Sequence, residues 1–315
     1  MVAVERPTWN ERSPKAAFCV FLFLPANFLK NLSPLNLNNP VLICSWQGWP
    51  DAAESATKSV EEILSQLEVI HSVEMNSDSY YIYSDKRPTV TNIKENLRHI
   101  DWLENKFSFI KRKGSKNDVV IFEGIEPDMD WKTYVNEFIK VIEFYEIKTV
   151  IMVGALLDSV PHTREPRITF TGTGKKNNSL LKKLKYSPPS YEGPAGITSV
   201  IGERLDNLKI ATISIWGHTP HYLQVTHNPI LSAAIMKELS NLLGLKLSFE
   251  KITKRSEEFR SSLNLALEDH NEITKYVERL EESYDTEEMS KIDPEPQLIL
   301  KDVENFLKDS RKDAD

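Results

Sequence analysis

The sequence has few cysteines, and their scarcity excludes two kinds of architecture. Only Cys19 and Cys44 occur among its 315 residues, too few for a disulfide framework or for a thiolate metal site. We therefore expect a reducing compartment, the cytoplasm. Cys44 lies in the apolar run VLICSW, which favours its interpretation as a small core residue.

The sequence also lacks a block of basic residues, and its net charge is −7. Nucleic-acid-binding proteins usually carry a basic stripe, so we expect no nucleic-acid partner. A net negative charge is typical of a cytosolic protein that its own charge keeps soluble.

The apolar stretch AAFCVFLFLPANFL, at 16–29, is too short to span a bilayer as a helix, which takes about 20 residues. We therefore expect no membrane partner. The stretch resembles the core of a signal peptide, but Glu5 and Glu11 interrupt the positive leader that such peptides carry. We interpret residues 1–39 as an N-terminal extension that is poorly ordered or begins at a start codon chosen in error, with export as the alternative.

No motif of a common enzyme class is present. The segment TGTGKKNNS resembles a phosphate-binding loop, but Lys176 stands where a hydroxyl residue belongs. The serine-hydrolase motif G-x-S-x-G and the zinc motif H-E-x-x-H are both missing. Three histidines, His162, His218 and His221, lack the ligand spacing of a zinc site. We therefore assign no catalytic residue and expect no metal and no cofactor.

Strand-like and helix-like segments alternate from about residue 40. Continuous apolar runs at 41–46, 118–124, 149–158 and 209–216 predict buried strands, and EVIHSVEM and RITFTGT predict two weaker ones. Helical spacing of apolar residues recurs at 51–67, 130–147 and 228–244. This alternation predicts an α/β domain at 40–246, with a mostly parallel sheet and helices on both faces.

A helical C-terminal region follows at 247–310. Residues 249–285 contain no glycine or proline, and their apolar residues recur at gaps of mostly three, four or seven. This spacing predicts an amphipathic segment, either one long helix or a broken pair. Pro294 and Pro296 end it, and LILKDVENFLKD predicts a last short helix before the tail at 311–315.

Ligands of an open parallel sheet bind at the carboxyl ends of its strands, and several polar segments follow predicted strands here. They are WQGWPDA, GIEPDMDW, DSVPHTREP and GHTPHY, together with the glycine-rich segment SYEGPAG. We predict that they line one rim. The candidate residues of a cleft or ligand-binding site are Trp49, Asp51, Glu126, His162, Arg164, Glu192, His218 and His221.

The segment VPHTREP, at 160–166, has two interpretations. His162 and Arg164 could act as an acid and an anion clamp, because histidine titrates near neutrality. Alternatively, His162 satisfies buried backbone carbonyls and Arg164 pairs with a carboxylate, so that both fix the shape of the loop. We favour the second, since no nucleophile stands beside them. Four tryptophans near these loops form either a binding surface or part of the core: Trp46, Trp49, Trp131 and Trp216.

Taken together and in order, these loops resemble the proteasome assembly chaperone 2 family. The segments that carry the resemblance are GWPDAAESAT, RPTV, FEGIEPDMDW, VGALLDSVPHTREP, YEGPAGITSVIGERL and ISIWGHTPHYLQVTHNP. YVERLEESYD and VENFLKD are similar to the C-terminal part of the bacterial, actinobacterial-type members. The resemblance covers about residues 40 to 310.

The resemblance implies a binding function rather than a reaction. The family is named for chaperones that help to assemble the proteasome α-ring, and its bacterial members look like trimers with a nucleoside-phosphorylase-like body. We expect a chaperone-like, protein-binding homo-oligomer, with a trimer favoured, whose partners are proteasome subunits or another protein. Members that dock on the proteasome often end in a hydrophobic residue, a tyrosine and any residue, whereas this sequence ends in RKDAD. The alternative is an enzyme or small-molecule-binding protein that uses the strand-end cleft.

Overall fold

The computed structural model describes residues 29–76, 78–94, 97–173, 191–223, 227–268 and 271–286. Most of the predicted N-terminal extension, the short helix predicted at 298–309 and the tail at 311–315 lie outside these residues. The strands are β1 (Leu29–Lys30), β2 (Val41–Gln47), β3 (His71–Met75), β4 (Thr89–Lys94), β5 (Leu97–Asp101), β6 (Asn105–Ile110), β7 (Val119–Ile125), β8 (Thr149–Asp158), β9 (Ile168–Gly172) and β10 (Ala211–Pro220). The helices are the short 3-10 turn η3 (Ala52–Glu54), α1 (Ser55–Leu64), α2 (Trp131–Phe144), α3 (Ile197–Asn207), α4 (Pro229–Leu243), α5 (Glu250–Glu268) and α6 (Asn271–Asp285).

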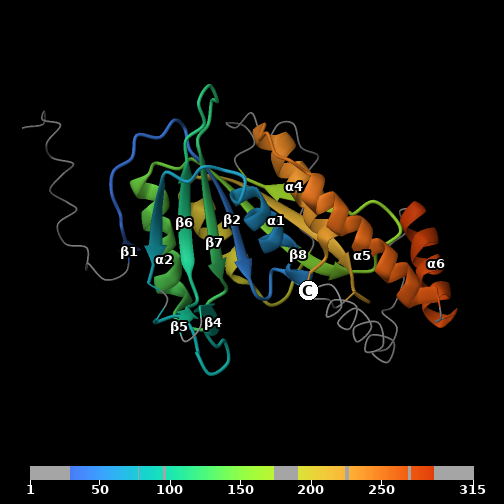
Figure 1. Ribbon diagram of the computed structural model, residues 1–315. Coiled ribbons are helices and arrows are strands. Elements are labelled where there is room, and N and C mark those ends of the chain that lie inside the picture. Colours follow the sequence, from blue (N-terminus) through green and yellow to red (C-terminus); the bar gives the residue numbers. More distant parts are fainter. Residues whose placement is uncertain are drawn as a thin grey trace, which may run out of the picture.

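An eight-stranded sheet in the order β1-β3-β6-β7-β2-β8-β10-β9 forms the body (Figure 1). Its four central strands, β7, β2, β8 and β10, run parallel, as their continuous apolar sequences predict. The outer strands pair in the antiparallel sense, so the sheet as a whole is mixed. The predicted α/β class is confirmed.

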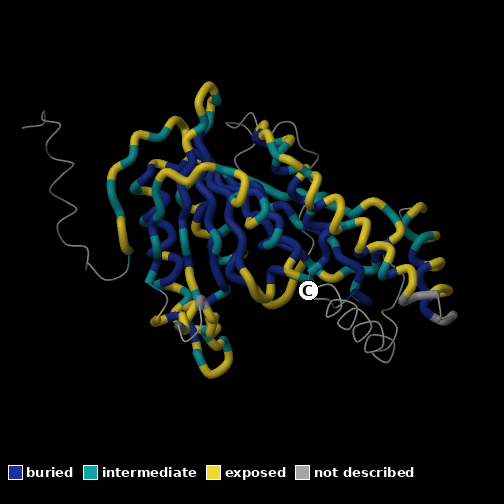
Figure 2. The backbone as a smooth tube through the Cα atoms, in the orientation of Figure 1, coloured by how far each residue is buried: buried dark blue, intermediate teal, exposed yellow. Residues whose placement is uncertain are grey.

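Helices cover both faces of the sheet, also as predicted (Figure 1). Because side chains alternate along a strand, β2 sends Leu42, Cys44 and Trp46 towards α2 and α3, and Val41 and Ile43 towards α1 and α4. Each face thus has its own apolar core, and the central strands are almost completely buried (Figure 2).

Strand β10 is longer than the sequence predicts. It continues from Trp216 to Pro220, and its last residues pair with the end of β8, Pro220 lying opposite Asp158. His218 therefore belongs to a strand rather than to the loop in which the sequence analysis placed it. Pairing with β8 explains the extension, because the two strands keep a continuous parallel ladder up to the rim.

The boundary drawn at residue 40 stays a prediction. Leu29 and Lys30 pair with β3 at the edge of the sheet, and Leu32, Leu35 and Leu37 pack against the core on the α2 side.

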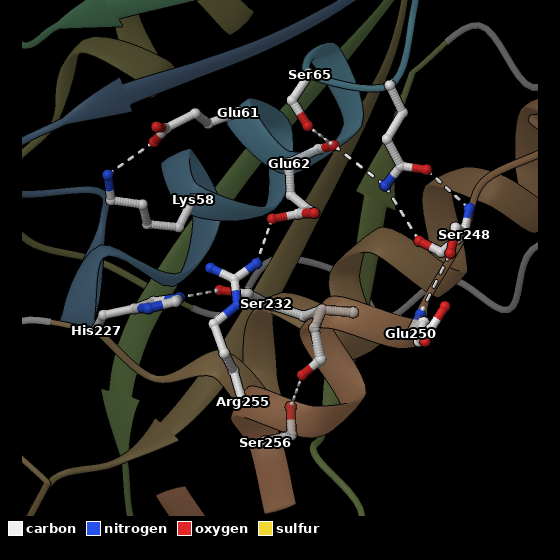
Figure 3. Close-up of polar contacts among 12 residues, drawn as sticks. Lys58, Glu61, Glu62, Ser65, His227, Ser232, Ser248, Glu250, Arg255 and Ser256 are labelled. Carbon is white, nitrogen blue, oxygen red and sulfur yellow. Dashed lines mark hydrogen bonds and ion pairs between the residues drawn. The ribbon is translucent and has the colours of Figure 1, made fainter. Parts of the chain in front are cut away.

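The C-terminal segment is a pair of helices, α5 and α6, which extend away from the sheet (Figure 1). Polar contacts attach α5 to α1, where Arg255 binds Glu62, and the backbone N–H of Ser248 donates to the side chain of Gln66 at 2.7 Å (Figure 3). Ile252 of α5 reaches the apolar core beneath α1 and α4. The N-terminal part of the pair is therefore held on the body by both apolar and polar contacts.

Candidate functional site

The carboxyl ends of β2, β7, β8 and β10 present the predicted segments along one end of the sheet. Their side chains fall into two groups. The first surrounds the N-termini of α1 and α3 and contains Trp49, Asp51 and Glu126. The second contains His162, Arg164, His218 and His221 and lies next to α6.

Asp51 anchors the start of α1. Its carboxylate accepts the backbone N–H groups of Ala56 at 2.8 Å and Thr57 at 3.2 Å, and it also binds the Thr57 hydroxyl. Burial raises the pKa of Asp51 to about 6, although these hydrogen bonds favour its ionised form. An acidic group at a helix N-terminus satisfies otherwise unpaired N–H groups, and that is the role the contacts give it.

Glu126 joins two loops at the N-terminus of α3. One carboxylate oxygen accepts the N–H of Ile197 at 2.9 Å, and the other accepts the N–H of Trp49 at 3.2 Å. The Trp49 indole lies over Gly196, where a Cβ atom would come within 2.8 Å of its Cε3 atom. The glycine thus permits the close contact, and the carboxylate of Glu126 occupies the positive end of α3.

Trp49 differs from the other three tryptophans of the predicted surface. It is 60% exposed, whereas Trp46 is completely buried and donates its indole N–H to Tyr134 at 2.9 Å. Trp131 and Trp216 are partly buried. Tyr191, 66% exposed, lies in the loop before α3 together with the exposed Glu192. Among the described residues of this rim, Trp49 and Tyr191 are therefore the exposed aromatic side chains.

His218 binds Asp158 across the neighbouring strands. Its Nδ1 atom lies 2.7 Å from the carboxylate, and its Nε2 atom lies 2.9 Å from the hydroxyl of Thr169. Burial disfavours ionisation of Asp158, but the hydrogen bond and the charge of His218 outweigh it, so the pKa of Asp158 lies below its ordinary value. Both ring nitrogens of His218 are thus engaged.

His221 connects the body to α6. Its Nδ1 atom lies 3.2 Å from the backbone carbonyl of Asp158, and its Nε2 atom lies 3.0 Å from the hydroxyl of Tyr276. The imidazole therefore bridges the end of β8 and a C-terminal helix.

His162 is buried against Tyr222. The tyrosine hydroxyl accepts the backbone N–H of His162 at 2.8 Å and lies 2.7 Å from its Nδ1 atom. Burial lowers the pKa of His162 to about 4, against the opposing effects of Asn264 and Glu281. The hydrogen bonds of His162 thus go to the side chains of Tyr222 and Asn264 rather than to carbonyls of its own loop.

Arg164 pairs with two carboxylates of α6. Its guanidinium binds Asp285 in a bidentate manner, with N–O distances of 3.0 and 2.8 Å, and its Nη1 atom lies 3.2 Å from Glu281. Nearby, the hydroxyl of Tyr284 donates to the carbonyl of Glu165 at 2.9 Å. We call these contacts, together with those of Thr163 to Glu281 and of His221 to Tyr276, the α6 latch.

An apolar cluster lies beneath the latch. Its buried residues come from the segment after β10, from α5 and from α6: Tyr222, Leu223, Phe259, Leu263, Ile273, Tyr276, Val277 and Leu280. The latch therefore surrounds a small third core, which holds the C-terminal helices to the rim. Among the latch residues, Tyr276, Glu281, Tyr284 and Asp285 were not among the predicted site residues, although YVERLEESYD was one of the segments that carry the family resemblance.

Little free volume remains around the histidines. His162, Arg164 and His218 line a cavity of about 20 Å³, which has room for about one water molecule. An open hollow of about 470 Å³ lies elsewhere, at the sheet edge beside His71 and Ser33. Across the described ranges, no three histidine, cysteine or carboxylate side chains are grouped so that they could hold a metal ion. In the same part of the chain, every helix is too short or too polar to cross a membrane.

Comparison with known proteins identifies the family. The model of the PAC2 family matches residues 45–266. A PAC2 family protein from Streptomyces avermitilis is 26% identical, with a TM-score of 0.67 over 76% of this chain and 99% of that one. A proteasome-assembly chaperone homologue from Mycobacterium tuberculosis is also 26% identical, with a TM-score of 0.64 over 75% of this chain and 99% of that one.

A protein of unknown function from Corynebacterium glutamicum has the same fold, with a TM-score of 0.72 and 22% identity over 83% of this chain and 98% of that one. No curated protein matches the sequence with significance. The family match spans residues 45–266, well over half of the chain, and contains both groups of rim residues, although not their partners in α6. The chain therefore belongs to the PAC2 family.

Proposed function

We propose that this chain is a protein-binding, assembly-chaperone-like protein that works without catalysing a reaction. In this proposal it forms a homo-oligomer in the cytoplasm, with a trimer favoured, and its partners are proteasome subunits or another protein. The similarity to the Mycobacterium tuberculosis chaperone homologue, which extends over 99% of that protein, supports a partner related to the proteasome.

The observation that carries the proposal is the engagement of the rim side chains. Glu126 accepts two backbone N–H groups, Arg164 binds two carboxylates, and both ring nitrogens of His221 have partners. A ligand pocket of the usual kind has roughly 300 Å³ or more, and the cavity at the histidines has about 20 Å³. The groups that acid–base chemistry would need are thus used to hold the structure together.

Trp49 is the best candidate for a partner contact on this rim. Aromatic side chains, tryptophan above all, are enriched among the residues that dominate binding energy at protein interfaces. The Trp49 ring is 60% exposed, and its backbone is fixed by Glu126, so the ring is presented from a rigid position. Tyr191, in the loop before α3, is a second exposed aromatic side chain at this end of the sheet.

The test is affinity capture of the tagged full chain from its native cell, combined with mass determination of the purified protein. We expect recovery of proteasome subunits and the mass of an oligomer. Trp49→Ala should lower partner recovery at least about tenfold, as for an interface hot spot, whereas Leu265→Ala, an equally exposed apolar position on α5, should leave it unchanged.

A monomer that captures no partner would overturn the proposal. A monomer whose thermal stability also rises with a small molecule would favour the enzyme or small-molecule-binding alternative instead. Equal loss of recovery in Trp49→Ala and Leu265→Ala would leave the chaperone-like role in place but refute the assignment of the rim as its contact surface.

A further inference from the structure

The hairpin of β4 and β5 forms a separate two-stranded sheet with two chemically different faces. On one face, Thr91 donates to Asp101 at 2.9 Å, and His99 pairs with the same carboxylate at 3.5 Å. On the other face, Val90 lies opposite Ile100 in the register of the strands. The hairpin is therefore amphipathic, although it stands apart from the eight-stranded sheet.

The apolar face of this hairpin is exposed. Val90 is 57% exposed, and Trp102, two residues after Ile100, is 55% exposed and stacks edge-on against Tyr83 at a ring distance of 5.3 Å. Ile82, beside Tyr83, adds a further exposed apolar side chain. Figure 2 shows this part of the molecule largely in yellow. A two-stranded sheet is at best marginally stable in water unless its apolar face is covered. We therefore expect another segment or molecule to cover this face.

The described chain begins close to this face. Leu29 lies opposite Met75 of β3, and Met75 lies opposite Asn105 of β6. Since neighbouring strands are about 4.8 Å apart, two such steps separate Leu29 from Asn105 by about 10 Å. Trp102 is three residues before Asn105, which adds at most about 10 Å. Leu29 is thus within about 20 Å of the exposed face.

The sequence before Leu29 has the composition that such a face would bind. Residues 16–28 read AAFCVFLFLPANF and contain no charged side chain. Extended, 13 residues span roughly 45 Å, more than twice the distance to Trp102. A tethered segment also experiences an effective concentration in the millimolar range, which favours it over a second copy of the chain.

We propose that residues 16–28 bind in cis over the apolar face formed by Val90, Ile100 and Trp102. Contact would remove apolar surface from water on both partners, which is the driving force for their association. Lys15 and Lys30, the charged residues on either side, limit the length of the apolar segment that covers the face. This inference is independent of the proposed proteasome-related function.

The two native cysteines allow a direct test. Cys19 lies within the proposed segment, whereas Cys44 is completely buried, and burial raises the pKa of its thiol, so it reacts slowly. Val90→Cys places a thiol on the apolar face, and Thr91→Cys places one on the opposite, polar face of the same strand. Both positions are exposed, so both variants of the full chain should fold.

After oxidation at low protein concentration, disulfide-linked peptides are identified by mass spectrometry. Because a disulfide requires Cα atoms about 4.4–6.8 Å apart, we expect at least ~5 times more intrachain bridge from Cys19 to position 90 than to position 91. Equal bridging, no bridging, or bridges between chains would overturn the proposal, the last in favour of a second copy as occupant.

Two further measurements test the same inference without a new cysteine. Removal of residues 1–28 should increase amide hydrogen exchange in β4 and β5 by about tenfold or more, because an uncovered hairpin opens readily. Exchange in β8, in the middle of the sheet, should not change. Unchanged exchange in the hairpin, or a native-cell protein whose measured mass lacks residues 1–28, would refute cis binding.

Discussion

Tyr222 is the residue on which the arrangement around His162 depends most directly, and its replacement by phenylalanine gives a quantitative prediction. The substitution keeps the buried ring and removes only the hydroxyl. The backbone N–H of His162 and its Nδ1 atom, 2.8 and 2.7 Å from that hydroxyl, then lose a partner inside the protein.

A buried polar group without a partner costs about 1–3 kcal/mol. Two such groups share one hydroxyl here, so we expect Tyr222→Phe to lower the free energy of unfolding by about 2–4 kcal/mol. The measurement is denaturant-induced unfolding at neutral pH, followed by fluorescence. Tyr284→Phe is the matched control, because it removes one exposed hydrogen bond of the neighbouring α6 latch and should cost less than about 1 kcal/mol.

Comparable free energies of unfolding for the two variants would refute this reasoning. A loss below about 0.5 kcal/mol for Tyr222→Phe would mean that His162 finds other partners at little cost. The polar contact would then contribute to the position of the loop but not to the stability of the third core.

Three further predictions concern pH, the latch and two glycines. As pH falls from 6.5 to 4, the unfolded chain protonates His162 before the folded one does, so the contribution of His162 to stability should decrease by up to about 3 kcal/mol, measured as the difference between denaturation curves of the native chain and of His162→Gln. Asp51, whose pKa burial raises, acts in the opposite sense over the same range, so the stability of the native chain alone should change less. Arg164→Ala should speed amide hydrogen exchange in α6, and added salt should have the same effect on the native chain. Arg164→Lys should restore protection from exchange only in part, because lysine cannot bind Asp285 in a bidentate manner. Gly154→Ala, whose Cβ would meet Trp216 at 2.6 Å, should destabilise the protein by about 1–3 kcal/mol. In thermal unfolding, Gly202→Ala in α3 should raise stability by about 0.5–1 kcal/mol, since its nearest neighbour is a methionine methyl group at 3.3 Å.

The central strands could be predicted because they are buried on both faces. A strand in that position needs apolar residues at every position, and the run at 149–158 accordingly matches β8 at both ends. Helix α4 was equally visible, since Asn228 caps its start, Pro229 follows, and Gly244 ends it with a φ of 62°. Local rules and tertiary packing agree in these elements.

Strand β6 and helix α3 could not be predicted in the same way. β6 carries Asn105 at a buried position, where its side chain binds the hydroxyls of Tyr81 at 2.7 Å and Tyr134 at 2.9 Å. Helix α3 contains several β-branched residues and Gly202, which weaken the intrinsic preference for a helix. Tertiary hydrogen bonds in one case, and packing of Ile197, Ile201 and Leu205 in the other, decide the structure.

The same limit applied to the candidate site. Its residues were selected because they follow strands, and they do lie at strand ends, but their partners are distant in the sequence. Nothing in VPHTREP itself indicates that Arg164 binds Asp285 or that Tyr222 binds His162. Such pairings depend on where α6 and the end of β10 come to lie, which local patterns do not encode.

The contact between Arg164 and Asp285 also sets the order in which the fold is completed during synthesis. The two residues are 121 positions apart, and at about 5 to 20 residues per second a ribosome needs roughly 6 to 24 s to cover that distance. For the part of this interval after β10 has been made and before α6 has, the emerging chain carries the rim of the sheet without the helix that covers it. The rim is therefore closed late, and only in chains whose translation has passed residue 285.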